Sequence, residues 1–412
     1  MRILQINNFH YIRGGAERSY LELCGLLKSR GHKVACFSTK DIKNHPSRWD
    51  KYFVKSYDLD KNYNPFLALK IIQNIFYNFA SKKSLQNLIQ DFKPSVAHLH
   101  NIYHHLSPSI ISVLKKNNIP MVMTLRDYKL ISPNYSLFSR GQIWEKTKNQ
   151  KYYKCFFDKS IKNSYLKSLI CTLEAYLHQW LKLYQKIDIF ISPSMFLANK
   201  FKDFGFKKQI INLPNPLLET PSPTSNNIKD FILYFGRLSP EKGIPNLINA
   251  YSKLKTKTPL LIAGSGASRK ELETLAKKNK NHSQIIFLGH KNKKELSCLI
   301  KSAKFLVFPS VWPENAPRSV IESMAFKKIV ICAKVGGIPE WVKHGQTGFL
   351  YPPGDVKKLA EIMSNLLNSK YNDKELQKIS SLAQKTVIQK NNPEKFYNSL
   401  INIYASLISD KN

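Results

Sequence analysis

The sequence predicts an α/β fold made of two tandem, doubly wound, Rossmann-like domains with a cleft between them. The first observation is that short apolar runs, typical of buried parallel strands, alternate with amphipathic helical stretches along most of the chain. The second is that a proline-rich segment at 213–227 interrupts this alternation, which then restarts. The third is size, because 412 residues, 43% of them hydrophobic, suffice for two or three domains with their own cores.

Residues 1–212 are expected to form the N-terminal domain. Its first strand is RILQIN (2–7), and an amphipathic helix follows at 15–31. Further strands are expected at KVACFS (33–38), VAHL (96–99), MVMT (121–124) and IDIFIS (187–192). Because helical stretches precede most of them, these strands are predicted to lie parallel in one sheet.

Residues 213–228 are predicted to be a linker, and residues 229–393 a second domain of the same kind. A last helix, at 394–412, has an apolar stripe and is expected to pack back on the N-terminal domain. Strands of the second domain are expected at FILYF (231–235), LLIAG (260–264), IIFLG (285–289), KFLVFPS (304–310) and IVICA (329–333).

A long basic helix is expected at 161–187. It combines leucines, tyrosines and Trp180 with flanking lysines. A helix of this kind either packs on its own domain or lies in a membrane interface. The sequence leaves both alternatives open.

The chain has the composition expected of a soluble cytoplasmic protein, with the inner face of the plasma membrane left open as a location. The first residues lack the pattern of a signal peptide, and no run of about 18 apolar residues is present. The scattered cysteines indicate a reducing compartment and argue against a structural metal site; they are Cys24, Cys36, Cys155, Cys171, Cys298 and Cys332.

The formal net charge of +36 invites anionic partners. The excess is spread evenly: 34 Lys and Arg stand against 14 Asp and Glu in residues 1–220, and 30 against 14 in residues 221–412. A dedicated nucleic-acid footprint would instead be concentrated on one face, so we expect no nucleic-acid partner. Biased composition and attraction to anionic lipid headgroups both remain open explanations.

The segment VWPENAPRSVIESMA (311–325) has the strongest functional pattern. A predicted strand ends, a loop presents Glu314, and Pro317 suits the first turn of a helix that carries Glu322. Backbone N–H groups at such a helix start bind a diphosphate, and a carboxylate one to two turns in can accept hydrogen bonds from ribose hydroxyls. Two glutamates at this spacing are usually surface residues, but ligands bind where strand ends meet helix starts in open α/β sheets. The candidate binding residues are Glu314, Asn315, Ala316, Ser319 and Glu322.

A second pattern, YFGRLSPEKGI (234–244), directly follows the first strand of the second domain. Gly236 permits a tight turn, and Arg237 and Lys242 bring two cations to one loop. Fixed cations stabilise the charge that develops on a departing diphosphate, although an ordinary solvated loop has the same composition. Gly264 gives a weaker signal of close backbone approach, and GGIPE (336–340) forms a turn-rich region nearby.

The N-terminal domain offers candidates for a second ligand. Gly14 and Gly15 start the first helix, where backbone N–H groups can meet a phosphate or sugar. HLHN (98–101) and TLRDYKLISPN (124–134) follow predicted strands, so their polar side chains are expected to face the cleft. These candidates are His100, Asn101, Arg126 and Asp127, and a purely structural His100 is the alternative.

Together these motifs resemble the retaining glycosyltransferase family 4, which has the GT-B fold. The resemblance runs over essentially the whole chain and is strongest in Glu314 and Glu322 with Arg237, Lys242 and GGIPE. It implies a metal-independent, cofactor-free hexosyl transfer from a nucleoside-diphosphate sugar to a saccharide or lipid-linked saccharide. The closest resemblance is to bacterial enzymes that make surface polysaccharides such as capsule, exopolysaccharide or O-antigen.

The resemblance also implies roles for individual residues. Glu322 would contact the ribose, Glu314 the donor sugar, and Arg237 with Lys242 the diphosphate. We therefore expect catalytic roles for Glu314, Arg237, Lys242 and His100. The donor-binding set adds Gly14, Gly15, Gly236, Gly264, Asn315, Ala316, Ser319 and Glu322, and the acceptor-side candidates are His100, Asn101, Arg126 and Asp127.

Two departures from the family pattern stand out. Many members have histidine where this chain has Arg126, so the role of that position is open. Similar sequences carry several cysteines after this motif, whereas here Cys155 is nearly alone. The alternatives are another enzyme of the same fold, such as a sugar-nucleotide epimerase or a phosphorylase, or a basic binding protein. The base, sugar, acceptor and oligomeric state are not specified by the sequence.

Overall fold

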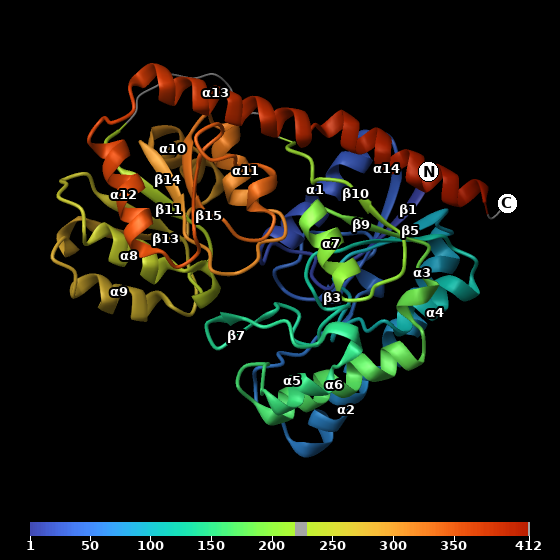
Figure 1. Cartoon of the computed structure of the whole chain (residues 1–412). Helices are drawn as coiled ribbons and strands as arrows, with labels where there is room; N and C mark the ends of the chain where they lie inside the picture. Colours follow the sequence, from blue (N-terminus) through green and yellow to red (C-terminus); the bar gives the residue numbers. More distant parts are fainter. Residues whose placement is uncertain (219–228, 411–412) are drawn as a thin grey trace.

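The computed structural model describes residues 1–218 and 229–410, which form two parallel β-sheets with helices around each (Figure 1). The first sheet has the strand order β10-β9-β6-β5-β1-β2. Its strands, all parallel, are β1 (Arg2–Ile6), β2 (Lys33–Phe37), β5 (Val96–Leu99), β6 (Met121–Thr124), β9 (Ile189–Ser192) and β10 (Ile210–Asn212).

The second sheet has the order β13-β12-β11-β14-β15-β16 and is also parallel throughout. In each sheet the strand order reverses beside the first strand, between β1 and β5 and between β11 and β14. Ligands bind at such switch points in open α/β sheets. The strands are β11 (Ile232–Phe235), β12 (Leu260–Ala263), β13 (Ile285–Gly289), β14 (Phe305–Phe308), β15 (Ile329–Ala333) and β16 (Phe349–Tyr351). The fold predicted from the sequence is thereby confirmed.

Helices cover both faces of the first sheet. Because side chains alternate along a strand, Leu4 and Ile6 pack on one face and Ile3 on the other. Apolar residues of α3 (Phe79–Phe92), α4 (Ser109–Lys116) and α7 (Met195–Asp203) cover the first face. Residues of α1 (Gly15–Ser29) and α14 (Pro393–Ser409) cover the second.

The second domain has one continuous apolar core around its sheet. Its helices are α8 (Ile244–Tyr251), α9 (Arg269–Lys277), α10 (Lys293–Ser302), α11 (Arg318–Ala325), α12 (Val356–Leu367) and α13 (Asp373–Lys390). Two minor sheets complete the strands: β3 (Thr39–Lys40) with β4 (Val54–Lys55), and β7 (Phe138–Ser139) with β8 (Gln142–Ile143).

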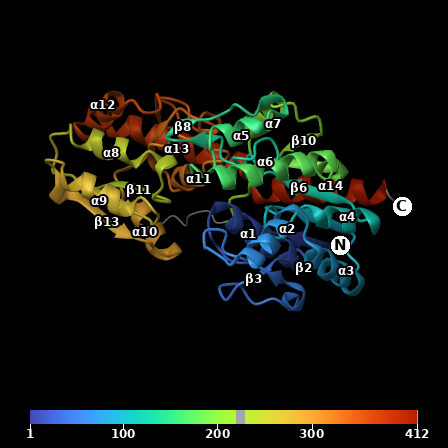
Figure 2. The ribbon, with the colours of Figure 1, turned by 90° about the horizontal axis from the view of Figure 1, so that it is seen from below.

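The last two helices pass from one domain to the other (Figures 1 and 2). Helix α13 packs in the core of the second domain through Ala383 and Val387, whereas α14 packs on the first sheet through Leu400. Between them lies Asn391, which is buried and whose side-chain amide donates to the carbonyl of Asn215. The two segments that join the domains therefore contact each other. Of the predicted linker 213–228, positions 219–228 lie outside the described residues.

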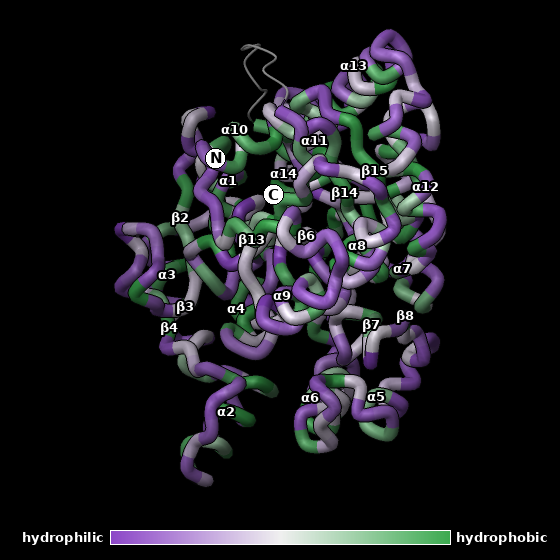
Figure 3. The backbone as a smooth tube through the Cα atoms, turned by 90° about the vertical axis from the view of Figure 1, so that its left-hand side faces the viewer, coloured by the Kyte–Doolittle hydropathy of each residue, from purple (hydrophilic) through white to green (hydrophobic). Residues whose placement is uncertain are grey.

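The helix expected at 161–187 is shorter than predicted. The observed α6 runs over Tyr165–Trp180, because the Ser164 hydroxyl accepts the Lys167 backbone N–H as an N-cap and Lys182 adopts a left-handed backbone. Together with α2 (Pro65–Phe76) and α5 (Tyr153–Phe157), it extends from one end of the molecule (Figure 3). No helix among the described residues is long and apolar enough to cross a membrane.

Candidate active site

A cavity of about 1370 Å³ lies between the two domains. Both domains line it with loops that follow the carboxyl ends of their strands. It is bordered by nearly all of the residues expected from the sequence: Gly14, Gly15, Arg126, Asp127, Gly236, Arg237, Lys242, Gly264, Glu314, Asn315, Ala316, Ser319 and Glu322. The structure thus brings together residues that are up to 308 positions apart in the chain, from Gly14 to Glu322.

The loop that presents Glu314 leads from β14 to the start of α11. The glycine pair of GGIPE holds this loop. Gly336 has φ +61°, and a Cβ added there would lie 2.4 Å from the backbone nitrogen of Glu314. The Gly337 N–H donates to the Glu314 carbonyl at 2.6 Å. Larger residues at these positions would displace Glu314 from the cavity wall.

Lys242 and Glu314 form an ion pair inside the cavity. Nζ of Lys242 lies 2.5 Å from Oε1 of Glu314, and the Ser310 hydroxyl donates to the same oxygen at 2.6 Å. Arg237 points toward the opposite wall, where a Cβ added to Gly14 would lie 3.2 Å from its Nη2 atom. A glycine at position 14 therefore leaves room for the guanidinium group. Two cations and a carboxylate face the same space.

Glu322 belongs to a four-residue ion-pair network between the domains, which the sequence analysis missed. Its Oε1 atom lies 3.0 Å from Nη1 of Arg18 and 2.9 Å from Nε of Arg318. Arg318 also pairs with Glu22 at 2.6 Å. Burial alone would lower the pKa of Arg318, but the carboxylates of Glu22 and Glu322 outweigh it and raise this pKa above its ordinary value.

The network could have been suspected from one signal. Arg18 and Glu22 are spaced i, i+4 near the start of the first helix, and Arg318 and Glu322 have the same spacing at the start of α11. In both helices the arginine precedes the glutamate, and two such pairs that meet across a cleft can exchange partners. The sequence does not show that these helix starts face each other, which only the packing of the domains determines.

The loop after β6 also reaches the cavity. Arg126 donates through Nη1 to Oδ1 of Asn215 at 2.7 Å, and its buried Nε atom has no hydrogen-bond partner among the described residues. Burial lowers the pKa of Arg126 to about 10 and raises that of Asp127 to about 6. The side chain of Asn315 donates to the carbonyl of Arg126 at 2.8 Å, so this loop contacts the loop of Glu314 directly.

Two predicted residues do not border the cavity. His100 is 1% exposed and lies behind Arg126, with its Nδ1 atom 3.4 Å from Nη2 of that arginine. It is also bonded to Gln5 and stacks on the ring of His98. Asn101 uses its backbone N–H to bond the side chain of Asn7. The polar residues of HLHN therefore support the loop of Arg126 from beneath instead of facing a ligand.

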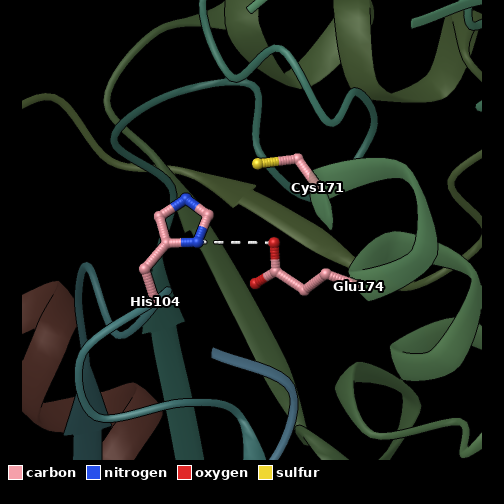
Figure 4. A group of neighbouring side chains, drawn as sticks. All are labelled: His104, Cys171 and Glu174. Atoms are coloured by element: carbon pink, nitrogen blue, oxygen red, sulfur yellow. Dashed lines mark ion pairs between the residues drawn. The ribbon is translucent and has the colours of Figure 1, made fainter. Parts of the chain in front are cut away.

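A second cluster of polar side chains lies outside the cavity, where His104, Cys171 and Glu174 meet (Figure 4). One ligand atom from each lies within 4.8 Å of the others, a spacing that would suit a metal ion. However, Nζ of Lys129 lies 2.6 Å from Oε2 of Glu174, so an ammonium group already neutralises this carboxylate. Against the effect of burial, His104 and Lys129 lower the pKa of Glu174. We infer that this cluster is structural and attaches α6 to the N-terminal domain.

Cys155 lies near the same cluster and is fully buried. Its Sγ atom accepts a hydrogen bond from the Ser160 hydroxyl at 2.9 Å, and Trp144 and Ile161 pack around it. Burial raises the pKa of its thiol. The position is thus part of a small apolar core beneath the cavity wall.

Two glycosyltransferase family models match almost the whole chain. Residues 13–217 match the model described as Glycosyltransferase Family 4, and residues 219–386 match Glycosyl transferases group 1. The chain belongs to the GT-B glycosyltransferases. The transferase is 26% identical over 364 residues to an uncharacterised 42.6 kDa protein from the cps region of Klebsiella pneumoniae, covering 82% of this chain and 87% of that protein.

Solved structures share the fold of this glycosyltransferase. Sucrose-phosphate synthase from Thermosynechococcus elongatus is 17% identical with a TM-score of 0.72, and the match covers 99% of both chains. Anabaena Alr3699/HepE, solved in complex with UDP and glucose, is 18% identical with a TM-score of 0.64, covering 98% of this chain and all of the other. At this identity the likeness shows the two-domain architecture alone. The family expected from the motifs is confirmed by the family models.

Proposed function

We propose that this glycosyltransferase moves a hexose from a nucleoside-diphosphate sugar to a saccharide or lipid-linked saccharide, with retention of configuration, during synthesis of a bacterial surface polysaccharide. The observation that carries the proposal is the cavity in which Arg237, Lys242, the start of α11 and Glu322 converge. The relative from a cps region supports the biological setting.

The diphosphate is proposed to bind between Arg237, Lys242 and the N-terminus of α11. Both cations line the cavity, and the first backbone N–H groups of a helix attract anions. A diphosphate would compete with Glu314 for Lys242, leaving the carboxylate of Glu314 to accept hydrogen bonds from sugar hydroxyls. Glu322 retains a second carboxylate oxygen for the ribose, although Arg18 and Arg318 already contact the first.

The proposed reaction needs no enzymic nucleophile. As the bond between the anomeric carbon and the diphosphate oxygen breaks, negative charge grows on the leaving group, and Arg237 and Lys242 stabilise it. The acceptor hydroxyl attacks the same face of the sugar and passes its proton to the departing phosphate oxygen. We propose that the two cations and the helix terminus replace a divalent metal. Closure of the cavity around both substrates would exclude water, which otherwise hydrolyses the donor.

The acceptor is proposed to enter on the side of Arg126 and Asp127. Both residues line the cavity from the N-terminal domain, beside the loop of Glu314. Burial raises the pKa of Asp127 to about 6. Near this pH the carboxyl group is present in both forms, so it can accept or donate a hydrogen bond. His100 keeps Arg126 in place from behind and is assigned a positioning role.

A thermal-shift screen with UDP, GDP, ADP and CDP in the presence of EDTA tests the donor site. We expect UDP to raise the melting temperature, because a structural neighbour was solved with UDP. A ligand at about 100 times its Kd adds roughly 2.7 kcal/mol to the stability of the native state. Glu322→Ala should abolish the rise. If no nucleotide stabilises the folded protein until a metal is added, the metal-free site is wrong.

Product analysis separates the transferase from the other enzymes of this fold. A sugar-nucleotide epimerase changes the donor sugar without any acceptor, whereas a transferase releases the nucleoside diphosphate in proportion to a new glycosidic bond. NMR of the anomeric proton in the product shows whether configuration is retained. An inverted product would contradict the proposed same-face attack.

A further inference from the structure

Helix α6 has its polar side inward and its apolar side outward. The residues of this helix that are buried are all polar: Ser168, Thr172, Glu174 and His178. The large apolar side chains recur every three or four positions on the other side and are exposed: Leu166, Leu169, Leu173, Tyr176 and Trp180. A helix that packs on its own domain in water has the opposite arrangement. This apolar face is therefore built for contact with something other than water.

The polar side is firmly attached, so the orientation of α6 is fixed. Glu174, which Figure 4 shows beside His104, also pairs with Lys129 at 2.6 Å. The imidazole of His178 bonds the carbonyl of Phe76 at the end of α2 at 2.9 Å, and the Ser168 hydroxyl accepts the backbone N–H of Ile161. Rotating α6 to bury its leucines would break these buried hydrogen bonds, each of which is costly to leave unsatisfied.

Neighbouring helices enlarge the apolar face. Helices α2 and α5 contact α6, and all three lie at the same end of the molecule (Figures 1 and 3). Among the described residues, 10 of the 20 exposed large apolar side chains belong to these three short helices. We call this surface the α6 face; it consists of Phe66, Leu69, Tyr153, Phe157, Tyr165, Leu166, Leu169, Leu173, Tyr176 and Trp180. These side chains are gathered on α6 and the two helices that contact it, whereas single apolar side chains scattered over a surface are normal.

The chain segments that form the α6 face are rich in lysine. Residues 148–186 contain eight lysines against two acidic residues, of which Glu174 is fully buried, and Asp60 pairs with two of the lysines, Lys162 and Lys167. Nζ of Lys159 lies 4.0 Å from the ring centroid of Tyr165 at the edge of the face. Apolar and aromatic side chains beside lysines match the boundary between acyl chains and anionic headgroups. Two copies of the same basic rim would repel each other, which disfavours a symmetric dimer through this face.

The cavity extends toward the α6 face. Its lining includes Tyr135, Arg140, Ser160, Lys162 and Asn163. Asn163 lies only two residues before the start of α6, so the acceptor side of the cavity and the apolar face adjoin along the chain. A substrate held in a bilayer by a lipid tail would meet the cavity close to the surface on which the enzyme rests.

We propose that the α6 face inserts into the headgroup region of an anionic lipid bilayer and brings the cavity to a lipid-linked acceptor. The insertion needs no donor, and only its purpose rests on the proposed function. Trp180, which is 78% exposed at the end of α6, reaches into the acyl boundary. The lysines of the rim bind the headgroups, which makes the attachment depend on anionic lipid and on salt.

Sedimentation of the full chain with vesicles tests this proposal. We expect binding to vesicles of phosphatidylcholine mixed with phosphatidylglycerol, and a decrease of about tenfold or more in Leu169→Ser/Leu173→Ser. Leu382→Ser/Ile388→Ser on α13 is the matched control, since both leucine and isoleucine there are similarly exposed, and it should bind like the native protein. Equal binding by both double variants would overturn the proposal.

Fluorescence separates insertion from surface attraction. Brominated acyl chains should quench the emission of Trp180 in the bound protein, and Trp180→Phe should remove this quenching. If the protein binds without quenching of Trp180, and salt abolishes this binding, the lysines alone attract the vesicles. That result would overturn insertion. If the protein does not bind vesicles but forms a dimer, and Leu169→Ser/Leu173→Ser dissociates that dimer, the face serves self-association instead. Stabilisation by UDP is measured without vesicles. A protein that does not bind vesicles can therefore still be tested for its donor site.

Discussion

The charged residues of the cavity have partners before any donor binds. Lys242 lies against Glu314, and Glu322 lies against Arg18 and Arg318. Binding a diphosphate and a ribose would therefore exchange ion pairs instead of adding new ones to free charges. The gain in free energy is smaller than the number of contacts suggests, because the carboxylates must find other partners. The benefit is a site whose side chains are already held in position.

Replacing Lys242 by Ala is expected to lower turnover by about 10²–10³. The lysine is proposed to stabilise charge on the leaving diphosphate, and its loss also leaves Glu314 without its ion-pair partner. Steady-state kinetics at saturating donor measure the effect. Lys358→Ala, at a surface pair with Glu361 in the same domain, serves as the control and should keep normal turnover. Turnover near the native value in Lys242→Ala would contradict the assignment.

Among helices and strands, the short apolar strands were predicted most accurately. VAHL, MVMT, IIFLG and IVICA match β5, β6, β13 and β15 residue for residue, because each shows as a run of mainly apolar residues between turn or helix signals. The edge strands β10 and β16 were missed. Each has only three residues, which is too short a run to show the pattern of a strand in the sequence.

His98 links two elements and makes stability depend on pH. Its Nδ1 atom lies 2.5 Å from the Tyr404 hydroxyl of α14, and its Nε2 atom 2.7 Å from the Thr124 hydroxyl. Burial lowers its pKa from 6.5 to about 3. Above pH 6.5 the ring is neutral in both states; between pH 6.5 and about 3 only the unfolded chain takes up the proton. Stability therefore decreases as the pH falls through this window.

Denaturant unfolding at several pH values between 7.5 and 5 measures this contribution. His98→Gln should lessen the loss of stability by about 1.4 kcal/mol per pH unit below 6.5. Tyr404→Phe removes the hydrogen bond but keeps the titrating ring, so it should lower stability while the pH dependence remains. Identical pH dependence in the native protein and His98→Gln would show that this histidine titrates alike in both states.

At the scale of the whole molecule, the site depends on contacts that no local pattern contains. The motifs identified the loops of Glu314, Lys242 and Arg126, because glycines, prolines and charges after apolar runs mark the carboxyl edges of sheets. The contact between Arg18 and Glu322 spans 304 positions and depends on how the two domains pack. His100 was expected to face a ligand for the same reason, but the direction of a side chain at a strand end depends on its neighbours.

Leu400→Ala tests how strongly α14 holds the first domain. This side chain is completely buried against the first sheet, so its truncation should lower the free energy of unfolding by about 2–5 kcal/mol. Leu382→Ala, 41% exposed on α13, should change it by less than about 0.5 kcal/mol. Denaturant unfolding at neutral pH gives both values. A change at position 400 as small as that at position 382 would show that α14 contributes little.

The position of α14 also constrains when the first domain can complete its folding during synthesis. A ribosome delivers the chain from the N-terminus, and domains generally fold in that order. Here the face of the first sheet that contains Ile3, Val96 and Val122 is covered partly by α1 and partly by residues 393–409, which are synthesised after the second domain. The first domain must wait, with an apolar surface uncovered, until the whole second domain has emerged. A nascent chain stalled before α14 should therefore recruit chaperones, whereas a chain that already includes α14 should recruit fewer.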